Sequence, residues 1–156
     1  MSEHRHADTD RISDPRFLHH VLHPHDLGTL TNADGSATGV GTCGDAVTVQ
    51  IRVENERIED LRTHPDGCSY TVACASALSC IAKQLPLEAA LEITPESLSE
   101  MLGGLPEDHF HCARLAINTL GEAIADYYRK LWGSPVSSQE KAIAKHSSPV
   151  MSRKKE

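Results

Sequence analysis

The chain has 156 residues with a formal net charge of −7, and 39% of its residues are hydrophobic while only 4% are aromatic. This length is typical of one domain with a modest core of aliphatic residues and alanine. The negative charge, with no basic stripe outside the last few residues, excludes nucleic acid as an expected partner.

The two ends of the chain differ in composition from its middle. Residues 1–12 are polar, and residues 133–156 are rich in Ser, Lys and Pro, so both segments are predicted to be flexible around one folded domain at 13–132. The polar N-terminus does not resemble a secretory signal, and no apolar run approaches the ~18 residues of a membrane span. A cytoplasmic location without membrane contact is therefore expected.

The first half of the domain is predicted to hold a short helix and then strands. The helix begins near Pro15, a residue that is favoured in the first turn. A segment rich in Gly, Ser and Thr follows and includes a short strand near Val40. Strands at 45–53 and 57–63 form a hairpin, and we expect the His-Pro pair at 64–65 to end it.

The second half of the domain is predicted to be helical. Apolar residues at helical spacing predict helices at 69–84, 86–92, 95–102 and 107–131. The small residues on both sides of the first of these helices predict that it is buried on more than one side. Strands followed by helices indicate an α+β fold, with helices on one face of a small antiparallel sheet.

The first strand of the hairpin places a carboxylate in an unexpected position. Val47, Val49 and Ile51 alternate with polar residues and form an apolar face. The same alternation puts Asp45 and Cys43 on that face. A buried carboxylate without a partner is costly, so Asp45 is expected to have one.

Three of the five cysteines occupy junctions between predicted elements. Cys43 precedes a strand, Cys68 lies between a strand and a helix, and Cys112 follows His111 in the first turns of the last helix. Helix N-termini stabilise thiolates, which are the form that binds metals. Soft thiolate ligands select zinc, Cu(I) or iron–sulfur clusters. Asp45 points the same way as Cys43, so a metal site at this convergence is one hypothesis.

The other reading of these residues is structural. Free cysteine is often buried, and Cys74 and Cys80, which lie inside a predicted helix, are expected to pack in the core. The histidines before Cys112 could be ordinary surface residues. His19 and His23 are four residues apart and could hold a metal on one helix face, although dense surface histidines also arise from composition alone.

The order of the motifs resembles the IscU/NifU N-terminal family of iron–sulfur cluster scaffold proteins. The resemblance extends over about residues 15–130. It rests on Cys-Gly-Asp at 43–45, Gly-Cys at 67–68 and His-Cys at 111–112, and is supported by His-Pro-His-Asp-Leu-Gly at 23–28, Ile-Glu-Asp at 58–60, Leu-Pro at 105–106 and Ile-Ala-Asp-Tyr at 124–127.

This resemblance implies a three-stranded antiparallel sheet with helices on one side and a site at one end. It implies Cys43, Cys68 and Cys112 as ligands of a cluster or of zinc. Asp45 would be the aspartate that keeps the cluster labile, and His111 would be the candidate fourth ligand.

The function that the resemblance implies is a scaffold and not an enzyme. A cysteine desulfurase would deliver sulfur, and iron and electrons would come from other donors. A [2Fe-2S] cluster or, alternatively, a [4Fe-4S] cluster would then form on the scaffold and pass to apo iron–sulfur acceptor proteins. The isolated protein could also hold zinc.

One branch of the family instead acts as a zinc-bound sulfur acceptor, with an insertion before the last cysteine and no histidine beside it. Here only 44 positions separate Cys68 from Cys112, and His111 is present, which favours the scaffold branch.

The chain departs from the family pattern before its last cysteine. The scaffold branch usually carries Leu-Pro-Pro-Val-Lys there, the segment that a dedicated Hsp70-type chaperone recognises, whereas this chain has Leu-Pro-Glu-Asp-His at 105–109. Two acids have entered and His109 takes the place of the lysine. Chaperone recognition in the usual manner is therefore not expected.

Two alternatives to the scaffold remain open. The first is the zinc-binding sulfur acceptor that never carries a cluster. The second is a thiol enzyme with Cys112 as nucleophile and His111 as base, which is disfavoured because helix neighbours project about 100° apart.

Overall fold

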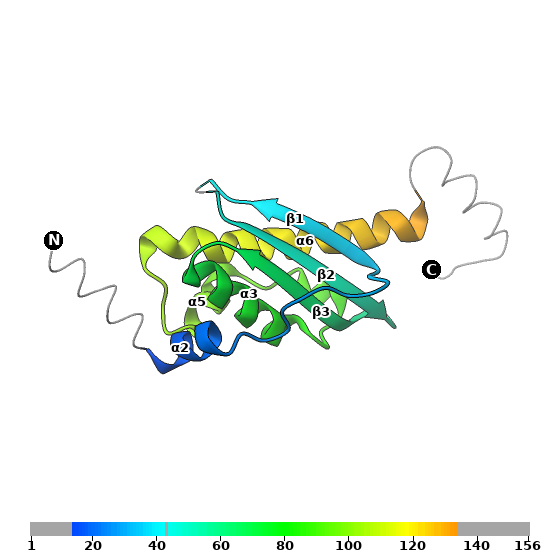
Figure 1. The fold of residues 1–156 in the computed structure, drawn as a ribbon. Coiled ribbons are helices and arrows are strands. Elements are labelled where there is room, and N and C mark those ends of the chain that lie inside the picture. The colour runs from blue at the N-terminus through cyan, green and yellow to red at the C-terminus, as the bar shows by residue number, and fades with distance from the viewer. Residues whose placement is uncertain (1–13, 43, 134–156) are drawn as a thin grey trace, which may run out of the picture.

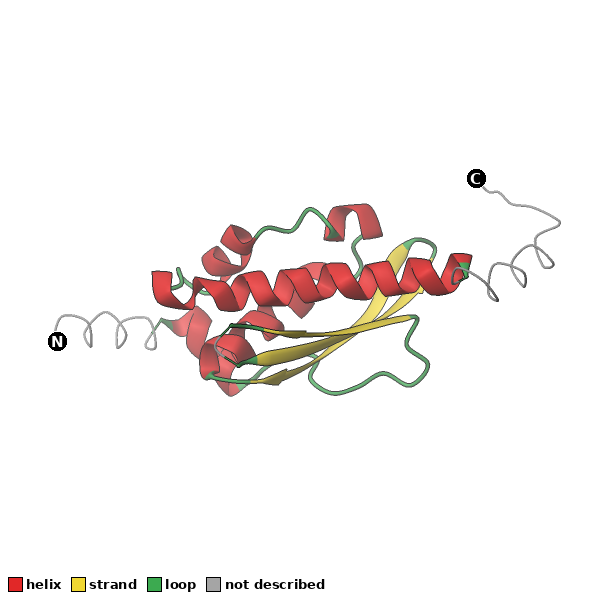
Figure 2. Cartoon of the chain, turned by 90° about the horizontal axis from the view of Figure 1, so that it is seen from above, coloured by secondary structure: helices red, strands yellow, loops and turns green. Residues whose placement is uncertain are grey.

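The computed structural model describes residues 14–42 and 44–133. The segments predicted to be flexible therefore lie outside the described residues, apart from Gly133, and so does Cys43. The elements in chain order are α2 (Pro15–Leu22), β1 (Gly35–Val40), β2 (Ala46–Glu54), β3 (Arg57–Asp66), α3 (Ser69–Ala82), α4 (Leu87–Ala90), α5 (Pro95–Met101), the 3-10 turn η1 (Glu107–His109) and α6 (Phe110–Trp132). The helices lie on one face of the sheet, with α6 running along it (Figure 2).

The sheet confirms the predicted α+β architecture. Its three strands are antiparallel in the order β1-β2-β3. Along β2 the side chains of Val47, Val49 and Ile51 are buried and alternate with half-buried polar ones, as the sequence period of two predicts. The chain turns from β2 into β3 through Asn55 and Glu56, both of which have positive φ values. The predicted hairpin is therefore correct.

Strand β1 is longer than the short strand expected near Val40, and its inner face is built from small residues. A Cβ atom at Gly35 would overlap the backbone oxygen of Ala123, and one at Gly39 would overlap the side chain of Thr119. Both partners belong to α6. These glycines therefore let the helix lie directly against the strand, which an amphipathic strand pattern does not reveal.

Strand β3 continues past the point where the sequence predicted its end. Residues 64–66 still pair with β2, and Pro65 lies opposite Val47. The expectation that His64 and Pro65 break the sheet is wrong because β3 is an edge strand, where a proline need not donate a ladder hydrogen bond. Part of the outer edge is covered by the segment after α2, since Gly28 N–H donates to Thr63 O at 2.9 Å.

Helix α3 is the centre of the core and is buried on more than one side, as predicted. It packs against β3, α2 and α6. The core that these elements enclose is built largely from aliphatic residues. Its largest fully buried aliphatic side chains are Ile51, Ile58, Leu61, Leu78, Leu87, Leu98, Leu102, Leu120, Ile124, Val47 and Val49. Among the described residues, none of the helices combines the length and apolarity needed to cross a membrane.

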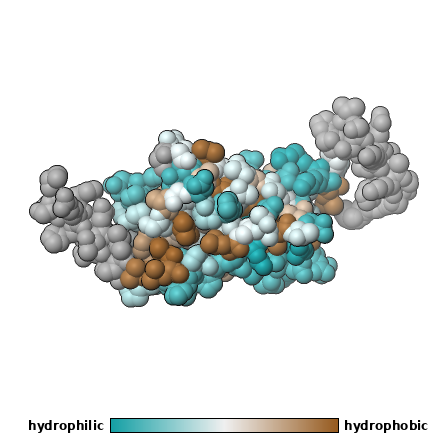
Figure 3. Space-filling model, viewed as in Figure 1, coloured by the Kyte–Doolittle hydropathy of each residue, from teal (hydrophilic) through white to brown (hydrophobic). Residues whose placement is uncertain are grey.

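The start of β2, the end of β3 and the first turns of α3 and α6 meet at one end of the sheet, with α2 beside them (Figure 1). The face of the molecule shown in Figure 3 is largely hydrophilic, and hydrophobic side chains gather over α2. Leu22 and Leu27, in and after α2, are 66% and 44% exposed. The predicted site residues that the structure describes lie where these chain segments converge.

Candidate metal centre

Asp45 lies at the entrance to β2 and has the partner that its position requires. The Thr71 hydroxyl donates a very short hydrogen bond to Asp45 Oδ2, and the Cys68 backbone N–H lies 3.5 Å from the same oxygen. Thr71 is in the first turn of α3. The carboxylate is therefore bound at a helix N-terminus, where negative charge is favourable.

Gly67 allows the carboxylate to approach the helix. A Cβ atom at this position would lie 2.6 Å from Asp45 Cγ and 2.7 Å from its Oδ2. Any other residue would push Asp45 away. The Gly-Cys motif is therefore explained by a close approach of the Asp45 side chain to the backbone before Cys68.

Two thiols lie beside this carboxylate. Thr71 Oγ1 is 3.7 Å from Cys68 Sγ and 3.6 Å from Cys112 Sγ, so one hydroxyl contacts the Asp45 carboxylate and both sulfurs. Cys68 is the N-cap residue of α3 and is exposed, whereas Cys112 in the first turn of α6 is 1% exposed. Burial, together with the nearby Cys68 and Asp45, raises the pKa of the Cys112 thiol to about 12, although the Thr71 hydrogen bond opposes this.

The third ligand-type group at the thiols is His109. A ring nitrogen of His109, Cys68 Sγ and Cys112 Sγ all lie within 4.8 Å of one another. His109 Nδ1 is buried and has no hydrogen-bond partner in the described part of the chain. A soft and borderline donor set of two thiols and an imidazole fits zinc or an iron–sulfur cluster.

His111, the predicted fourth ligand, also lies near the thiols. Its Nε2 is 3.7 Å from Cys112 Sγ, and its ring centroid is 6.3 Å from that of His109. The contact between His111 and Cys112 would allow a base and a thiol to meet. A buried thiol with a raised pKa is nevertheless a poor nucleophile, which argues against the thiol-enzyme alternative.

An aromatic stack holds His109 in place. The His109 ring lies on the Tyr70 ring with centroids 3.8 Å apart and an interplanar angle of 10°. Tyr70 also contacts Phe17 of α2, with centroids 5.0 Å apart. The imidazole plane is therefore fixed by α3 and, behind it, by α2.

The structure thus brings Asp45, Cys68, His111 and Cys112 together, and Cys43 lies outside the described residues. Sequence reasoning did not select His109 as a ligand. The signal that could have done so was its place, three residues before Cys112 and therefore on the same side of a continuing helix.

The sequence matches the family model described as the NifU-like N terminal domain over residues 8–132. The chain belongs to this family. Relatives in the family support the assignment. Iron-sulfur cluster assembly scaffold protein IscU 1 of Archaeoglobus fulgidus is 41% identical over 116 residues, which cover 74% of this chain and 76% of that protein. The scaffold protein IscU of Aquifex aeolicus is 39% identical over 118 residues, which cover 74% of this chain and 75% of that protein.

Solved structures of NifU-like proteins share the fold. The N-terminal NifU-like protein of Brucella abortus superposes with a TM-score of 0.62 at 18% identity, covering 78% of this chain and 98% of that one. The iron-sulfur cluster assembly scaffold protein for the SUF system, described as putative, from Fervidobacterium islandicum superposes with a TM-score of 0.58 at 17% identity, covering 72% and 96% of the two chains. The predicted fold class is therefore confirmed.

The remaining cysteines of this NifU-like domain differ from one another. Cys74 is buried in the core as predicted, and burial raises the pKa of its thiol. Cys80 was expected to pack in the core as well, but its side chain is exposed. The expectation failed because α3 reaches the surface near its C-terminus, next to the segment that follows α2.

Proposed function

We propose that this protein is a scaffold on which an iron–sulfur cluster is assembled and from which it is transferred to apo-proteins. The observation that carries the proposal is the group of Cys68, Cys112 and His109, whose ligand atoms lie within 4.8 Å of one another beside the Asp45 carboxylate. The names of the IscU relatives agree with it. The cluster is cargo here, so the site must bind it and also release it.

The proposed ligands are the three cysteines Cys43, Cys68 and Cys112, with His111 as the candidate fourth ligand and Asp45 as the weak ligand that keeps the cluster labile. His109 joins this set as a competitor for the same position, because its ring nitrogen is grouped with the two thiols. Asp45 supplies a hard oxygen among soft sulfurs. Such a mismatch weakens the hold on the cluster, and the hydrogen bond from Thr71 gives the carboxylate a second partner when the cluster leaves.

Assembly on this site has a simple chemical course. A scaffold thiolate attacks the outer sulfur of a persulfide carried by a cysteine desulfurase, and the desulfurase thiolate leaves. The transferred sulfur is then reduced to sulfide by electrons from ferrous iron and from an external electron donor. The ligand thiols lose their protons on binding iron. Of the two thiols that the structure describes at this site, Cys68 is the exposed one and is therefore better placed for the first contact.

The proposed partners are a cysteine desulfurase and apo iron–sulfur proteins. The segment before Cys112 presents the exposed acids Glu107 and Asp108 in the turn η1. This charge supports the prediction that a chaperone of the Hsp70 type does not bind there in the usual manner. The cytoplasmic location and the absence of catalytic turnover also stay predictions.

Anaerobic reconstitution tests the proposal. The full chain is incubated with ferrous iron, cysteine, a reductant and a cysteine desulfurase, and the visible absorption of a cluster is followed. We expect a [2Fe-2S] cluster in the wild type, none in Cys68→Ala or Cys112→Ala, and a normal cluster in Cys80→Ser, which removes a thiol outside the site. The zinc-binding sulfur-acceptor alternative predicts stoichiometric zinc and no iron uptake, and that outcome would refute the scaffold proposal.

A pair of variants separates the two histidines. His109→Gln and His111→Gln are compared for cluster half-life and for zinc affinity in the same assay. If His111 is the fourth ligand, His111→Gln shortens the half-life more. The opposite ranking assigns that position to His109 and overturns the ligand predicted from the sequence.

A further inference from the structure

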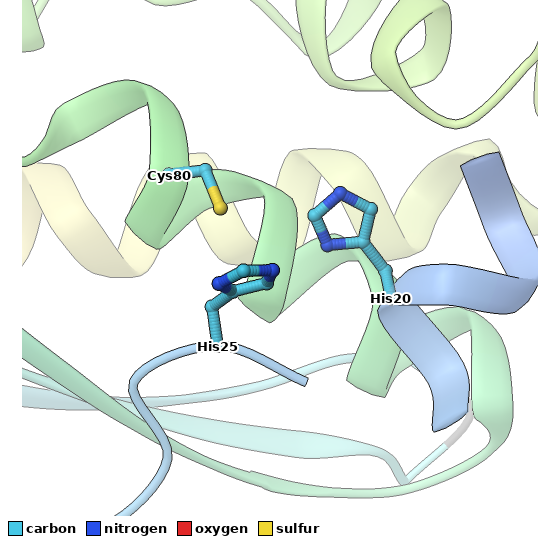
Figure 4. A group of neighbouring side chains, drawn as sticks. All are labelled: His20, His25 and Cys80. Carbon is cyan, nitrogen blue, oxygen red and sulfur yellow. The ribbon is translucent and has the colours of Figure 1, made fainter. Parts of the chain in front are cut away.

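A second group of metal-binding side chains lies away from the thiols of the candidate metal centre. It consists of His20 from α2, His25 from the segment after α2, and Cys80 from the last turn of α3 (Figure 4). One ligand atom from each lies within 4.8 Å of the other two. In Figure 4 the sulfur of Cys80 points toward the His25 ring.

This group is distinct from the candidate metal centre. Cys80 follows Cys68 by twelve positions on α3, which corresponds to about 18 Å along a helix. The first group lies at the N-terminus of α3, and the second lies near its C-terminus. Side chains of one group therefore cannot reach a metal in the other.

Hydrogen bonds hold the two imidazoles in place. Ser76, one turn before Cys80 on α3, has its hydroxyl 2.7 Å from His20 Nδ1, and the same oxygen accepts the backbone N–H of His25 at 2.8 Å. His19 Nε2 lies 2.8 Å from His25 Nε2. Ring orientations are thus set before any ligand arrives, which is the role that outer hydrogen bonds have around metal sites.

The chemistry of the three groups suits a zinc-like ion. Zinc takes imidazole nitrogens at about 2.0–2.1 Å and thiolates at about 2.3 Å in tetrahedral geometry, so its ligand atoms are roughly 3.3–3.7 Å apart. Rotation of the exposed Cys80 side chain can close a group already within 4.8 Å toward that spacing.

We propose that His20, His25 and Cys80 form a second metal site, for zinc or another divalent transition-metal ion of similar softness. A water molecule completes the tetrahedron. Bound metal ties α2 and the segment after it to α3, since each of these elements supplies one ligand. The site does not depend on the proposed scaffold function.

The exposed thiol of Cys80 provides the test. The full chain is treated with EDTA, dialysed and alkylated with iodoacetamide with and without excess zinc, and the Cys80 peptide is quantified by mass spectrometry. We expect zinc to slow alkylation of Cys80 by more than tenfold. The protection is lost in His25→Gln, and it persists in Cys68→Ser, in which the candidate metal centre lacks a thiol.

Controls make the outcome decisive. His64→Gln removes an exposed histidine of β3 that belongs to neither group. In this variant we expect zinc to protect Cys80 from alkylation as it does in the wild type. Equal alkylation with and without zinc would overturn the proposal, and so would protection that survives in His25→Gln or disappears in Cys68→Ser. If His25→Gln does not fold, zinc stoichiometry replaces it: Cys80→Ser must bind one equivalent less than the wild type, and an unchanged stoichiometry refutes the site.

Discussion

The substitution Gly67→Ala tests whether the position of the Asp45 carboxylate controls release of a cluster. The new Cβ would lie 2.6 Å from Asp45 Cγ, whereas an ordinary contact between carbons is about 3.5–4.0 Å. The Asp45 side chain must therefore move by about 1 Å. The backbone of Gly67 does not have a positive φ value, so alanine introduces no backbone strain.

The displacement is expected to act like removal of the Asp45 side chain. Asp45 loses its alignment with Thr71 and with the Cys68 N–H, and it no longer reaches the cluster in the same geometry. A loss of about 1 kcal/mol in the transition state for release corresponds to about a fivefold slower transfer. The free energy of unfolding falls by about 1 kcal/mol, at the low end for overpacking, because Asp45 is only half-buried and can turn toward solvent.

The assay is transfer of the reconstituted cluster to an apo-ferredoxin, followed by circular dichroism, with Asp45→Ala measured in parallel. We expect both variants to assemble the cluster and to transfer it more slowly. Gly41→Ala is the matched control, because its Cβ would meet only ordinary contacts at 3.5 and 3.7 Å. Wild-type transfer rates in Gly67→Ala, or an equal slowing in Gly41→Ala, would refute the role assigned to Asp45.

Three further predictions concern packing, thiol reactivity and pH. In urea unfolding, Gly35→Ala lowers the free energy of unfolding by more than 1 kcal/mol, because its Cβ would overlap a backbone oxygen of α6. Gly121→Ala is the comparison, because its Cβ would have no atom within 4 Å, and it raises the free energy of unfolding by about 0.4–1 kcal/mol. In the metal-free protein at pH 8, Cys112 is alkylated at least about a hundredfold more slowly than Cys68, because Cys112 is buried and its pKa is raised to about 12. Peptide mass spectrometry measures both rates, and equal rates would contradict this prediction. The lowered pKa of His20 means that its ring binds fewer protons in the folded metal-free protein than in the unfolded chain. The contribution of His20 to the urea midpoint is therefore complete above about pH 6.5 and is lost as the pH falls below that value, so the fall in the midpoint is smaller in His20→Gln.

The part of the fold that was predictable is the part governed by periodicity. Val47, Val49 and Ile51 revealed the buried face of β2, and extending that period placed Asp45 on the same side, where it contacts the buried Thr71. Small residues on both sides of α3 correctly indicated a central helix. These predictions depend only on local spacing, which the sequence states directly.

Features that depend on a partner segment were not predictable in the same way. Pro65 remains in β3 because, among the described strands, none pairs with that edge at Pro65, and the sequence does not say which strand is at the edge. Gly35 resembled part of a polar loop, although it is where α6 approaches β1. Cys80 lies on an apparently apolar helix, and its exposure depends on where the helix ends relative to its neighbours.

The residues of the candidate site likewise differ in whether the sequence alone could predict them. The motifs around Asp45, Cys68 and Cys112 were found because each has a recognisable short pattern and because the family resemblance orders them. His109 was assigned no role, because its contact with the thiols arises from the turn η1 and from stacking on Tyr70. The group of His20, His25 and Cys80 was predicted only in part. The histidines near the N-terminal helix were noted, with His19 and His23 as the pair that could hold a metal, but Cys80 was not connected with them, since only folding brings these segments together.

The stack of His109 on Tyr70 limits the directions from which His109 can bind. An imidazole donates through lone pairs that lie in the plane of its ring, so a ring held parallel to Tyr70 accepts an ion only within that plane. Phe17 contacts the same tyrosine and positions it from α2. Displacing α2 would therefore leave the number of ligand atoms unchanged and alter the direction of the His109 lone pair. The effect would appear in the lifetime of the bound cluster rather than in the amount of cluster that binds.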